Sequence, residues 1–172
     1  MFQPSQIRHA TDAGALAWLD QLLVAVWRSS TYEGADIFYD EMKKGFQRFK
    51  TGVGHLAVIE PKSPMPSPES RQRITQVFDE HPTACAAVAV VFEGTGFFAS
   101  AVGSVASGIM LLSGRKTPFR VCNSVPEAAL FLARHMSVHG EPITPGLCKS
   151  AVEELRTALS LPRRTSRPPR MP

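Results

Sequence analysis

The sequence predicts an α/β fold: an N-terminal β-hairpin, then alternating helices and strands that form a mixed, largely parallel sheet, and a C-terminal helix. Two kinds of segment predict it. Short continuous apolar runs are typical of strands that are covered on both faces. Between them lie segments whose apolar residues recur at spacings of three and four, which is typical of helices. Strands that alternate with helices imply parallel neighbours in the sheet.

The first predicted elements are a hairpin, a helix and a buried strand. Residues 15–19 and 22–28 are apolar runs separated by only two polar residues, which indicates a hairpin. A helix is predicted over residues 35–50. Its apolar residues share one face: Phe38, Met42, Phe46 and Phe49. The apolar run at residues 55–59 then predicts a strand that is buried on both faces.

A stiff loop is predicted next, because residues 61–68 contain four prolines. Ser67 followed by Pro68 is typical of a helix start, since serine caps the helix and proline fits its first position. This helix should end before Pro82. Residues 84–92 then predict a second strand that is buried on both faces.

The remaining elements of the domain are two helices and a short strand. A helix is predicted at residues 97–113, and its small residues, Gly103 and Gly108 among them, favour close approach to a strand or another helix. A short strand is expected at residues 119–122. A further helix should start at Ser124 and end near Gly140.

A last amphipathic helix is predicted at about residues 145–161. Its apolar residues are Leu147, Val152, Leu155 and Leu159. Because they are too many to leave exposed, we expect this helix to form an interface with a second copy or a protein partner, or else to fold back on its own sheet. The predicted units are an arm (1–13), the α/β domain (14–140), a linker with this accessory helix (141–161) and a disordered basic tail (162–172).

Charge and cysteine content argue against three kinds of protein: nucleic-acid-binding, disulfide-stabilised and zinc-stabilised ones. The formal net charge of +4 arises largely from the tail, which holds Arg163, Arg164, Arg167 and Arg170. The domain itself is therefore near neutral, and we expect no specific nucleic-acid partner. The chain has three cysteines, at Cys85, Cys122 and Cys148. Their odd number and wide spacing argue against a disulfide framework and against a structural zinc site.

We expect a cytoplasmic protein without a membrane span. The first ten residues lack the apolar core of a signal peptide. The longest apolar stretch, residues 84–112, is interrupted by Glu93 and the glycine turn that follows it, so neither half reaches the length of about 20 residues that a membrane helix needs. Reduced, buried thiols are expected at Cys85 and Cys122, which lie in apolar runs.

The element order resembles the STAS superfamily and, within it, the SpoIIAA-like branch. The local match consists of Ala-Val-Ala-Val-Val at residues 87–91, a glycine turn, a helix, then Pro-Phe-Arg-Val-Cys at 118–122 and Pro-Glu-Ala-Ala-Leu-Phe-Leu at 126–132. The resemblance covers roughly residues 14–138. It implies a non-catalytic regulatory module of bacterial signalling that acts through a protein partner, with no cofactor.

The resemblance also points to the loop at residues 60–70. In anti-sigma-factor antagonists of this family, the corresponding loop carries Asp-Ser-Ser-Gly, and a serine in it is phosphorylated. Here the loop offers Ser63 and Ser67 as candidate regulatory serines, but it lacks that motif. For Ser67 a simpler role is that of a helix cap.

Two further hypotheses compete with a regulatory role. The turn Gly94, Thr95 and Gly96 lies between a strand and a helix, where backbone N–H groups can hold a phosphate, so the protein could bind a nucleotide. No acidic residue ends the next strand, as a dinucleotide site would require. Alternatively, the small residues of the helix at 97–113 could leave room for a lipid or small apolar ligand, bordered by Phe97, Phe98 and Met110.

The sequence contains no recognisable catalytic set. His135 and His139 have the spacing of metal-ligand pairs on a helix, but no third ligand is evident near them, so we expect no metal site. No nucleophile motif or phosphate-binding Walker loop occurs. We therefore expect no enzyme activity.

Overall fold

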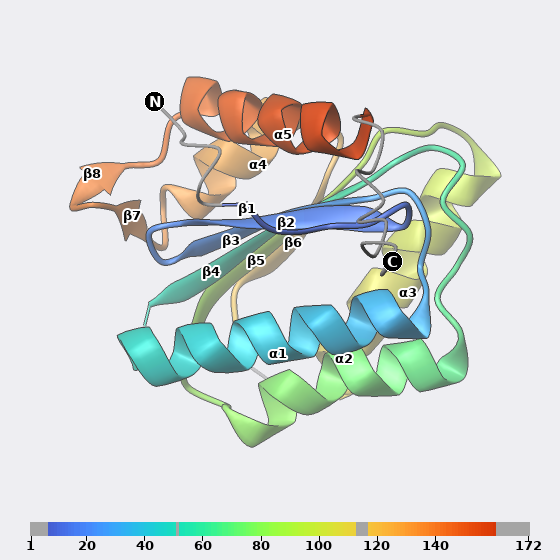
Figure 1. The fold of residues 1–172 in the computed structure, drawn as a ribbon, viewed down its shortest axis with the longest axis horizontal. Helices are drawn as coiled ribbons and strands as arrows, with labels where there is room; N and C mark the ends of the chain where they lie inside the picture. Colours follow the sequence, from blue (N-terminus) through green and yellow to red (C-terminus); the bar gives the residue numbers. More distant parts are fainter. Residues whose placement is uncertain (1–6, 51, 113–116, 161–172) are drawn as a thin grey trace, which may run out of the picture.

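The computed structural model describes residues 7–50, 52–112 and 117–160, which form a three-layer α/β structure (Figure 1). Its central sheet contains six strands of the described chain, and their order in the sheet equals their order in the sequence. The strands are β1 (Ile7–Ala10), β2 (Gly14–Leu19), β3 (Leu22–Trp27), β4 (Val53–Ile59), β5 (Cys85–Phe92) and β6 (Phe119–Cys122). The first three pair antiparallel and the last four pair parallel, which confirms the predicted mixed, largely parallel sheet.

Helices cover both faces of this sheet (Figure 1). One face carries α1 (Tyr32–Phe49), α2 (Pro68–Glu80) and α3 (Phe97–Leu112), each of which connects two parallel strands. The other face carries α4 (Val125–Leu132) and α5 (Pro145–Ser160). A short hairpin of β7 (Ser137–Val138) and β8 (Glu141–Pro142) lies between these two helices in the chain. None of the described helices is long and apolar enough to cross a membrane.

Polar side chains set the helix starts, as the sequence predicts. Ser67 caps α2 by accepting a hydrogen bond from the N–H of Ser70 at 3.2 Å, and Pro68 occupies the first turn. Thr31 caps α1 in the same way, accepting from the N–H of Gly34 at 3.0 Å. Each cap satisfies a backbone donor that has no partner inside its helix.

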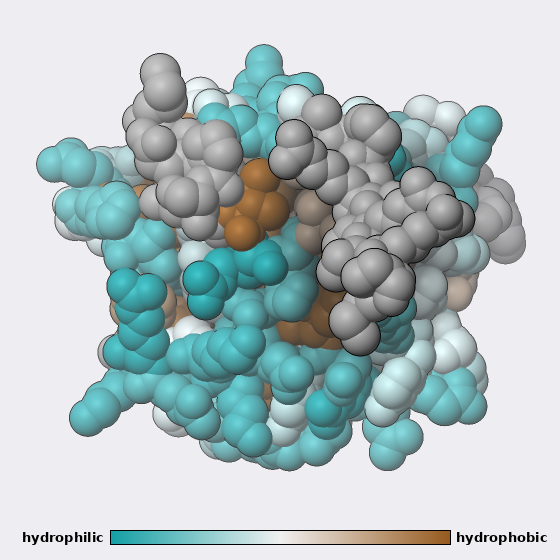
Figure 2. All heavy atoms as spheres, viewed as in Figure 1, coloured by the Kyte–Doolittle hydropathy of each residue, from teal (hydrophilic) through white to brown (hydrophobic). Residues whose placement is uncertain are grey.

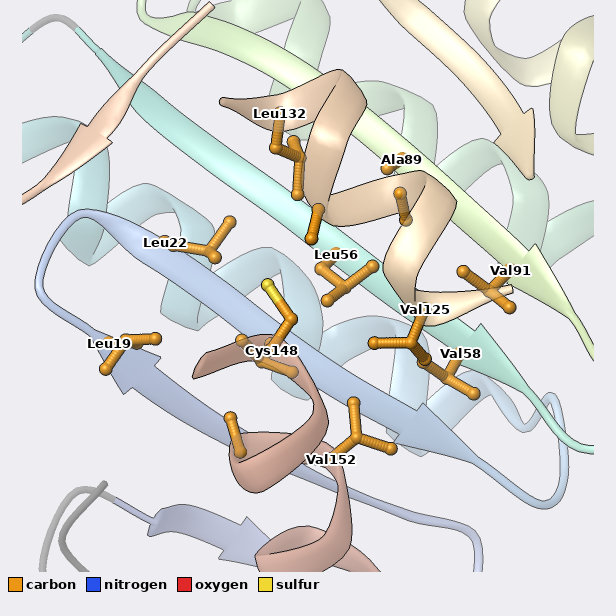
Figure 3. Packing of buried hydrophobic residues seen from close by; sticks show 14 of the residues in the cluster. Leu19, Leu22, Leu56, Val58, Ala89, Val91, Val125, Leu132, Cys148 and Val152 are labelled. Atoms are coloured by element: carbon orange, nitrogen blue, oxygen red, sulfur yellow. The ribbon is translucent and has the colours of Figure 1, made fainter. Parts of the chain in front are cut away.

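Because the strands are covered on both sides, their side chains alternate between two apolar cores. The first core lies between the sheet and α4 and α5, where Leu22, Leu56 and Val58 face Leu132 and Val152 (Figure 3). The second lies between the sheet and α1 and α2. It includes residues from each layer: Leu23, Phe38, Met42, Phe46, Phe78 and Val88.

Two elements differ from the prediction, and a third lies outside the described residues. The arm is not a separate unit, because Ile7–Ala10 pairs with β2 as the edge strand of the sheet. The helix predicted to reach Gly140 ends at Leu132. The chain then turns into the β7–β8 hairpin, where His139 and Gly140 adopt positive φ angles of 51° and 77° that no helix can continue. The predicted basic tail, 162–172, lies outside the described residues.

The terminal helix α5 folds back on this chain's own sheet, which was one of the two expected arrangements. Val152 is 1% exposed and Leu155 is fully buried, both in the first core. Leu147 and Leu159 are partly buried against the same core. Of the four residues predicted as a possible interface, two are therefore buried and two are partly buried against this chain's own core. Residues 145–160 belong to the domain and are not accessory to it.

Shortening one buried side chain of α5 tests whether this helix packs on the sheet. We expect Leu155→Ala to lower the free energy of unfolding by about 2–5 kcal/mol, since it removes a fully buried side chain and leaves a void. The matched control is Leu130→Ala on α4, where the leucine is 57% exposed and the change should stay within about 0.5 kcal/mol. Urea unfolding measures both. Equal effects would contradict the packing of α5 on the sheet.

Candidate functional site

A cavity of about 140 Å³ lies between the sheet and the helices α1, α2 and α3, and it is partly open to solvent. Ala57 and Val90 line it from the sheet, and Phe38 and Phe78 line it from α1 and α2. The third helix, α3, closes it with a row of four side chains: Val102, Val105, Ala106 and Ile109. The surface over α1 and α2, in the lower half of Figure 2, is mostly hydrophilic.

The cavity exists because α3 packs loosely. Among the α3 side chains that the structure describes, only Val102 is buried. A Cβ atom added at Gly103 would come no nearer than 4.0 Å to Val121, and one added at Gly108 would meet nothing within 4 Å. The prediction that these glycines permit close approach is therefore wrong. The side chains of Phe97, Phe98 and Met110, which were expected to border a guest, lie outside the described part of the chain.

Ser63 is the first polar group in the cavity wall. It lies in the proline-rich loop after β4, where its N–H donates to the carbonyl of Glu60 at 3.0 Å. The residue is 1% exposed, and its hydroxyl has no hydrogen-bond partner among the described residues. A buried hydroxyl without a partner costs about 1–3 kcal/mol. Its oxygen has less than 1 Å² of accessible surface, so it is closed to a molecule in the cavity as well as to solvent.

His55 is the second polar group in the wall. It lies in β4 and is 5% exposed, and its ring packs against Phe38 with centroids 4.8 Å apart. Its Nδ1 lies 3.0 Å from the carbonyl oxygen of Leu23, which can only accept, so Nδ1 carries the hydrogen. Burial lowers the pKa of His55 to about 4, although the bond to Leu23 opposes the shift. At neutral pH the ring is uncharged, and Nε2 is left as a hydrogen-bond acceptor.

The rest of the wall is uncharged. Among the described residues that line the cavity, none is Lys, Arg, Asp or Glu. The remaining polar side chains are the hydroxyls of Ser29, Ser30 and Thr31, which follow β3, and that of Ser70, which begins α2. An ionised ligand would find no opposite charge here, and burying it would be costly. The cavity therefore suits uncharged molecules.

The predicted phosphate-binding turn, Gly94–Thr95–Gly96, is not part of this cavity. A Cβ atom at Gly94 would overlap the ring of Phe92, and Gly96 has a positive φ of 75°, so the local backbone accounts for both glycines. Beside the turn, Glu93 pairs with Arg156 of α5. The same arginine also meets two further carboxylates, those of Glu60 and Glu153. This acidic surrounding disfavours an anion, and phosphate binding at the turn stays a prediction.

The two candidate regulatory serines lie in different environments. Ser63 is buried in the cavity wall, as described above. Ser67 is exposed, and its hydroxyl caps α2. A modifying enzyme can therefore reach Ser67 in this conformation, whereas Ser63 is shielded from it.

The other candidate groups do not assemble into a reactive site. His135 packs against Phe131, with ring centroids 4.9 Å apart, whereas the N–H of His139 donates to Asp20 at 2.8 Å. The two histidines were expected on one helix face. Because α4 ends at Leu132, before either of them, they do not share such a face. Within the described ranges, no three potential ligands gather as a metal site would need.

The cysteines of the chain are buried and form no disulfide, as predicted for Cys85 and Cys122. Burial raises the pKa of Cys122 to about 11, with a further contribution from Glu127, and that of Cys148 to about 12. Both stay protonated at neutral pH and are poor nucleophiles.

Comparisons of the chain with protein-family models, with curated proteins and with solved structures found no match. The function must therefore be inferred from the geometry of the site. Sequence reasoning raised a small-ligand cavity beside α3 as one alternative, but it missed the roles of Ser63 and His55. A histidine inside an otherwise apolar strand run was the available signal for His55.

The buried histidine predicts a specific pH dependence. Between about pH 6.5 and pH 4 the unfolded chain binds a proton at residue 55 that the folded chain does not bind, so the free energy of unfolding falls as pH falls through this window. The loss should total on the order of 3 kcal/mol. His55→Asn keeps a donor for the Leu23 carbonyl without titrating, and should lose this part of the dependence. Urea unfolding at several pH values measures the free energy of unfolding of both proteins. If this free energy fell equally with pH in the wild type and in His55→Asn, the assignment of the pH dependence to His55 would be contradicted.

Proposed function

We propose that this protein is a non-catalytic binding protein whose cavity holds a small apolar ligand. The observation that carries the proposal is an apolar cavity of about 140 Å³ between the sheet and three helices, with no charged side chain among the described residues that line it. Ligand sites are typically apolar cavities with a few polar groups that fix orientation.

Ser63 and His55 support a binding role over a catalytic one. An activated serine needs a base within hydrogen-bond reach. The Ser63 hydroxyl makes no hydrogen bond to any described residue, and the Nδ1 of His55 is engaged by Leu23. The two groups thus do not form a nucleophile–base pair.

Filling the cavity from α3 tests the proposal. Benzene is a suitable probe, since an engineered cavity of about 150 Å³ is known to bind it. We expect benzene to shift NMR signals of Val102 and Ile109 in the wild-type protein, and Ala106→Leu to weaken this binding at least about tenfold because the larger side chain occupies the space. Ala101→Leu is the matched control on the same helix, since Ala101 does not line the cavity.

The proposal fails if benzene does not bind the wild-type protein, or if both variants bind it equally. Native mass spectrometry of protein purified from its own cells gives an independent readout. A co-purified small molecule that is absent from Ala106→Leu and present in Ala101→Leu would support the proposal.

A second candidate function is the cytoplasmic regulatory role of a SpoIIAA-like STAS module, which would act through a protein partner or a second copy. The observation that favours it is the exposed Ser67 at the start of α2, directly after the loop that follows β4. A phosphate there would lie at the positive end of the helix dipole, where negative charge is stabilised. Residues 63–66 of the same loop line the cavity, so the two candidate functions share one segment.

Phosphorylation mapping tests the second candidate. After incubation with ATP in an extract of the source cells, we expect phosphate on Ser67 and none on Ser63, because only the first is exposed. Ser67→Asp should abolish the modification at this site while it keeps the helix cap, so its melting temperature should stay close to that of the wild type. If phosphate is found at neither serine, or at Ser63 alone, this role is contradicted.

A further inference from the structure

We infer that the cavity binds a neutral molecule with an apolar body and an N–H or O–H group that donates a hydrogen bond to the ring of His55. The inference rests on the proposed function and adds to it the chemical class of the ligand. Two observations carry it: the place of His55 in the cavity and the state of its two ring nitrogens.

The cavity runs lengthwise along strand β4. Every second residue of this strand lines it, from His55 through Ala57 to Ile59, because alternate side chains of a strand share one face. At about 3.3 Å per residue, these positions span roughly 13 Å. Their neighbours on β5, Val88 and Val90, line the cavity as well. The cavity is therefore elongated along the strands, with His55 near their N-terminal ends.

His55 lies in a deeply buried part of this elongated cavity. The residue is 5% exposed, and the lining side chains of Phe38 and Val88 beside it are each 3% exposed. Near the C-terminal ends of the strands, Ser30 and Met65 are partly exposed. Because the cavity is partly open to solvent, a ligand can extend beyond it, and the volume sets no limit on ligand length. The group that reaches His55 is withdrawn from water.

The ring of His55 offers this group an acceptor. Its hydrogen on Nδ1 bonds to the carbonyl of Leu23 at 3.0 Å, so Nε2 carries a lone pair. No described residue bonds to Nε2, and Nε2 is not one of the completely covered polar atoms of the described chain. Its open surface therefore faces the cavity that the ring lines. A buried acceptor without a partner is unfavourable, so a ligand that donates to Nε2 gains affinity.

The hydroxyls in the wall are less suited to select a ligand. The oxygen of Ser63 is completely covered. Those of Thr31 and Ser70 already accept hydrogen bonds within the protein. Those of Ser29 and Ser30 belong to partly exposed residues, so water can bond to them. The histidine is therefore the buried group whose hydrogen bond a ligand must complete.

The acceptor and the uncharged wall together define the ligand class. An indole-type or pyrrole-type N–H, or the O–H of an alcohol or phenol, can donate to Nε2. A ketone or an ether only accepts, so it would place its lone pairs against that of the ring. An ammonium group donates, but no carboxylate among the described lining residues offsets its charge, and a carboxylate ligand likewise finds no cation there.

Three probes test the ligand class in the full-length protein at pH 7: indole, benzofuran and indole-3-carboxylate. Indole and benzofuran have nearly the same shape, but only indole donates a hydrogen bond. We expect indole to bind about fivefold more tightly than benzofuran, which is the increment of one hydrogen bond, and indole-3-carboxylate to bind most weakly. NMR titration of the cavity-lining methyl groups gives each affinity. The ¹⁵N signal of Nε2 in His55 should shift with indole and stay in place with benzofuran.

Two variants test the assigned residue. The amide of His55→Asn keeps a donor for the Leu23 carbonyl but is too short to place an acceptor where Nε2 lies. The preference for indole over benzofuran should therefore disappear. Ser30→Ala is the matched control, because it removes a polar group from another part of the same cavity wall, and it should keep the preference.

The outcomes separate this inference from the proposal beneath it. If benzofuran binds the wild-type protein as tightly as indole, if indole-3-carboxylate binds more tightly than indole, or if benzene binds and indole does not, the ligand class is wrong while the binding function stands. If His55→Asn keeps the full preference, the assigned residue is wrong. If neither benzene nor any of the three probes binds, the proposed function itself fails. The wild-type comparison needs no variant, so it decides the ligand class even if His55→Asn does not fold.

Discussion

The structure depends on a sheet whose central strands are apolar on both faces. In β3, β4 and β5 nearly every side chain is buried, so neither face can be left to solvent. This constraint requires helices in two layers, and it explains why α5 is needed: α4 alone is too short to cover the face over β2 and β3. On the opposite face α1 and α2 bring large side chains, whereas α3 brings small ones. The cavity is the consequence of that difference.

Local signals in the sequence determined most of the fold. The hairpin, the three parallel strands and the caps at Ser67 and Ser124 depend on neighbouring residues, and they were predictable. The edge strand Ile7–Ala10 was not, because its polar residues show no apolar run and only pairing with β2 makes it a strand. The C-terminal end of α4 and the packing of α3 depend on tertiary contacts in the same way. For the site, the sequence raised an apolar guest beside α3 as one alternative, but which serine faces inward could be seen only in three dimensions.

The proline-rich loop after β4 contributes to the fold and to both candidate functions. It holds Ser63 in the cavity wall and, a few residues later, presents Ser67 to solvent as the cap of α2. Prolines give this segment few alternative conformations, so the two serines keep these distinct environments without many supporting hydrogen bonds. A ligand that contacts Pro64 or Met65 therefore acts on a segment that is directly continuous with the start of α2.

The placement of α5 also has a consequence for biosynthesis. The first core joins Leu19, Leu22 and Val24 near the start of the chain to Val152 and Leu155 near its end. While the chain is being translated, the hairpin of β2 and β3 can form early, but one of its faces lacks its cover until α5 has been synthesised. During that interval the nascent chain exposes an apolar sheet face. Such a surface is a natural binding site for chaperones, and the order of the elements thus delays burial of this face until α5 is available.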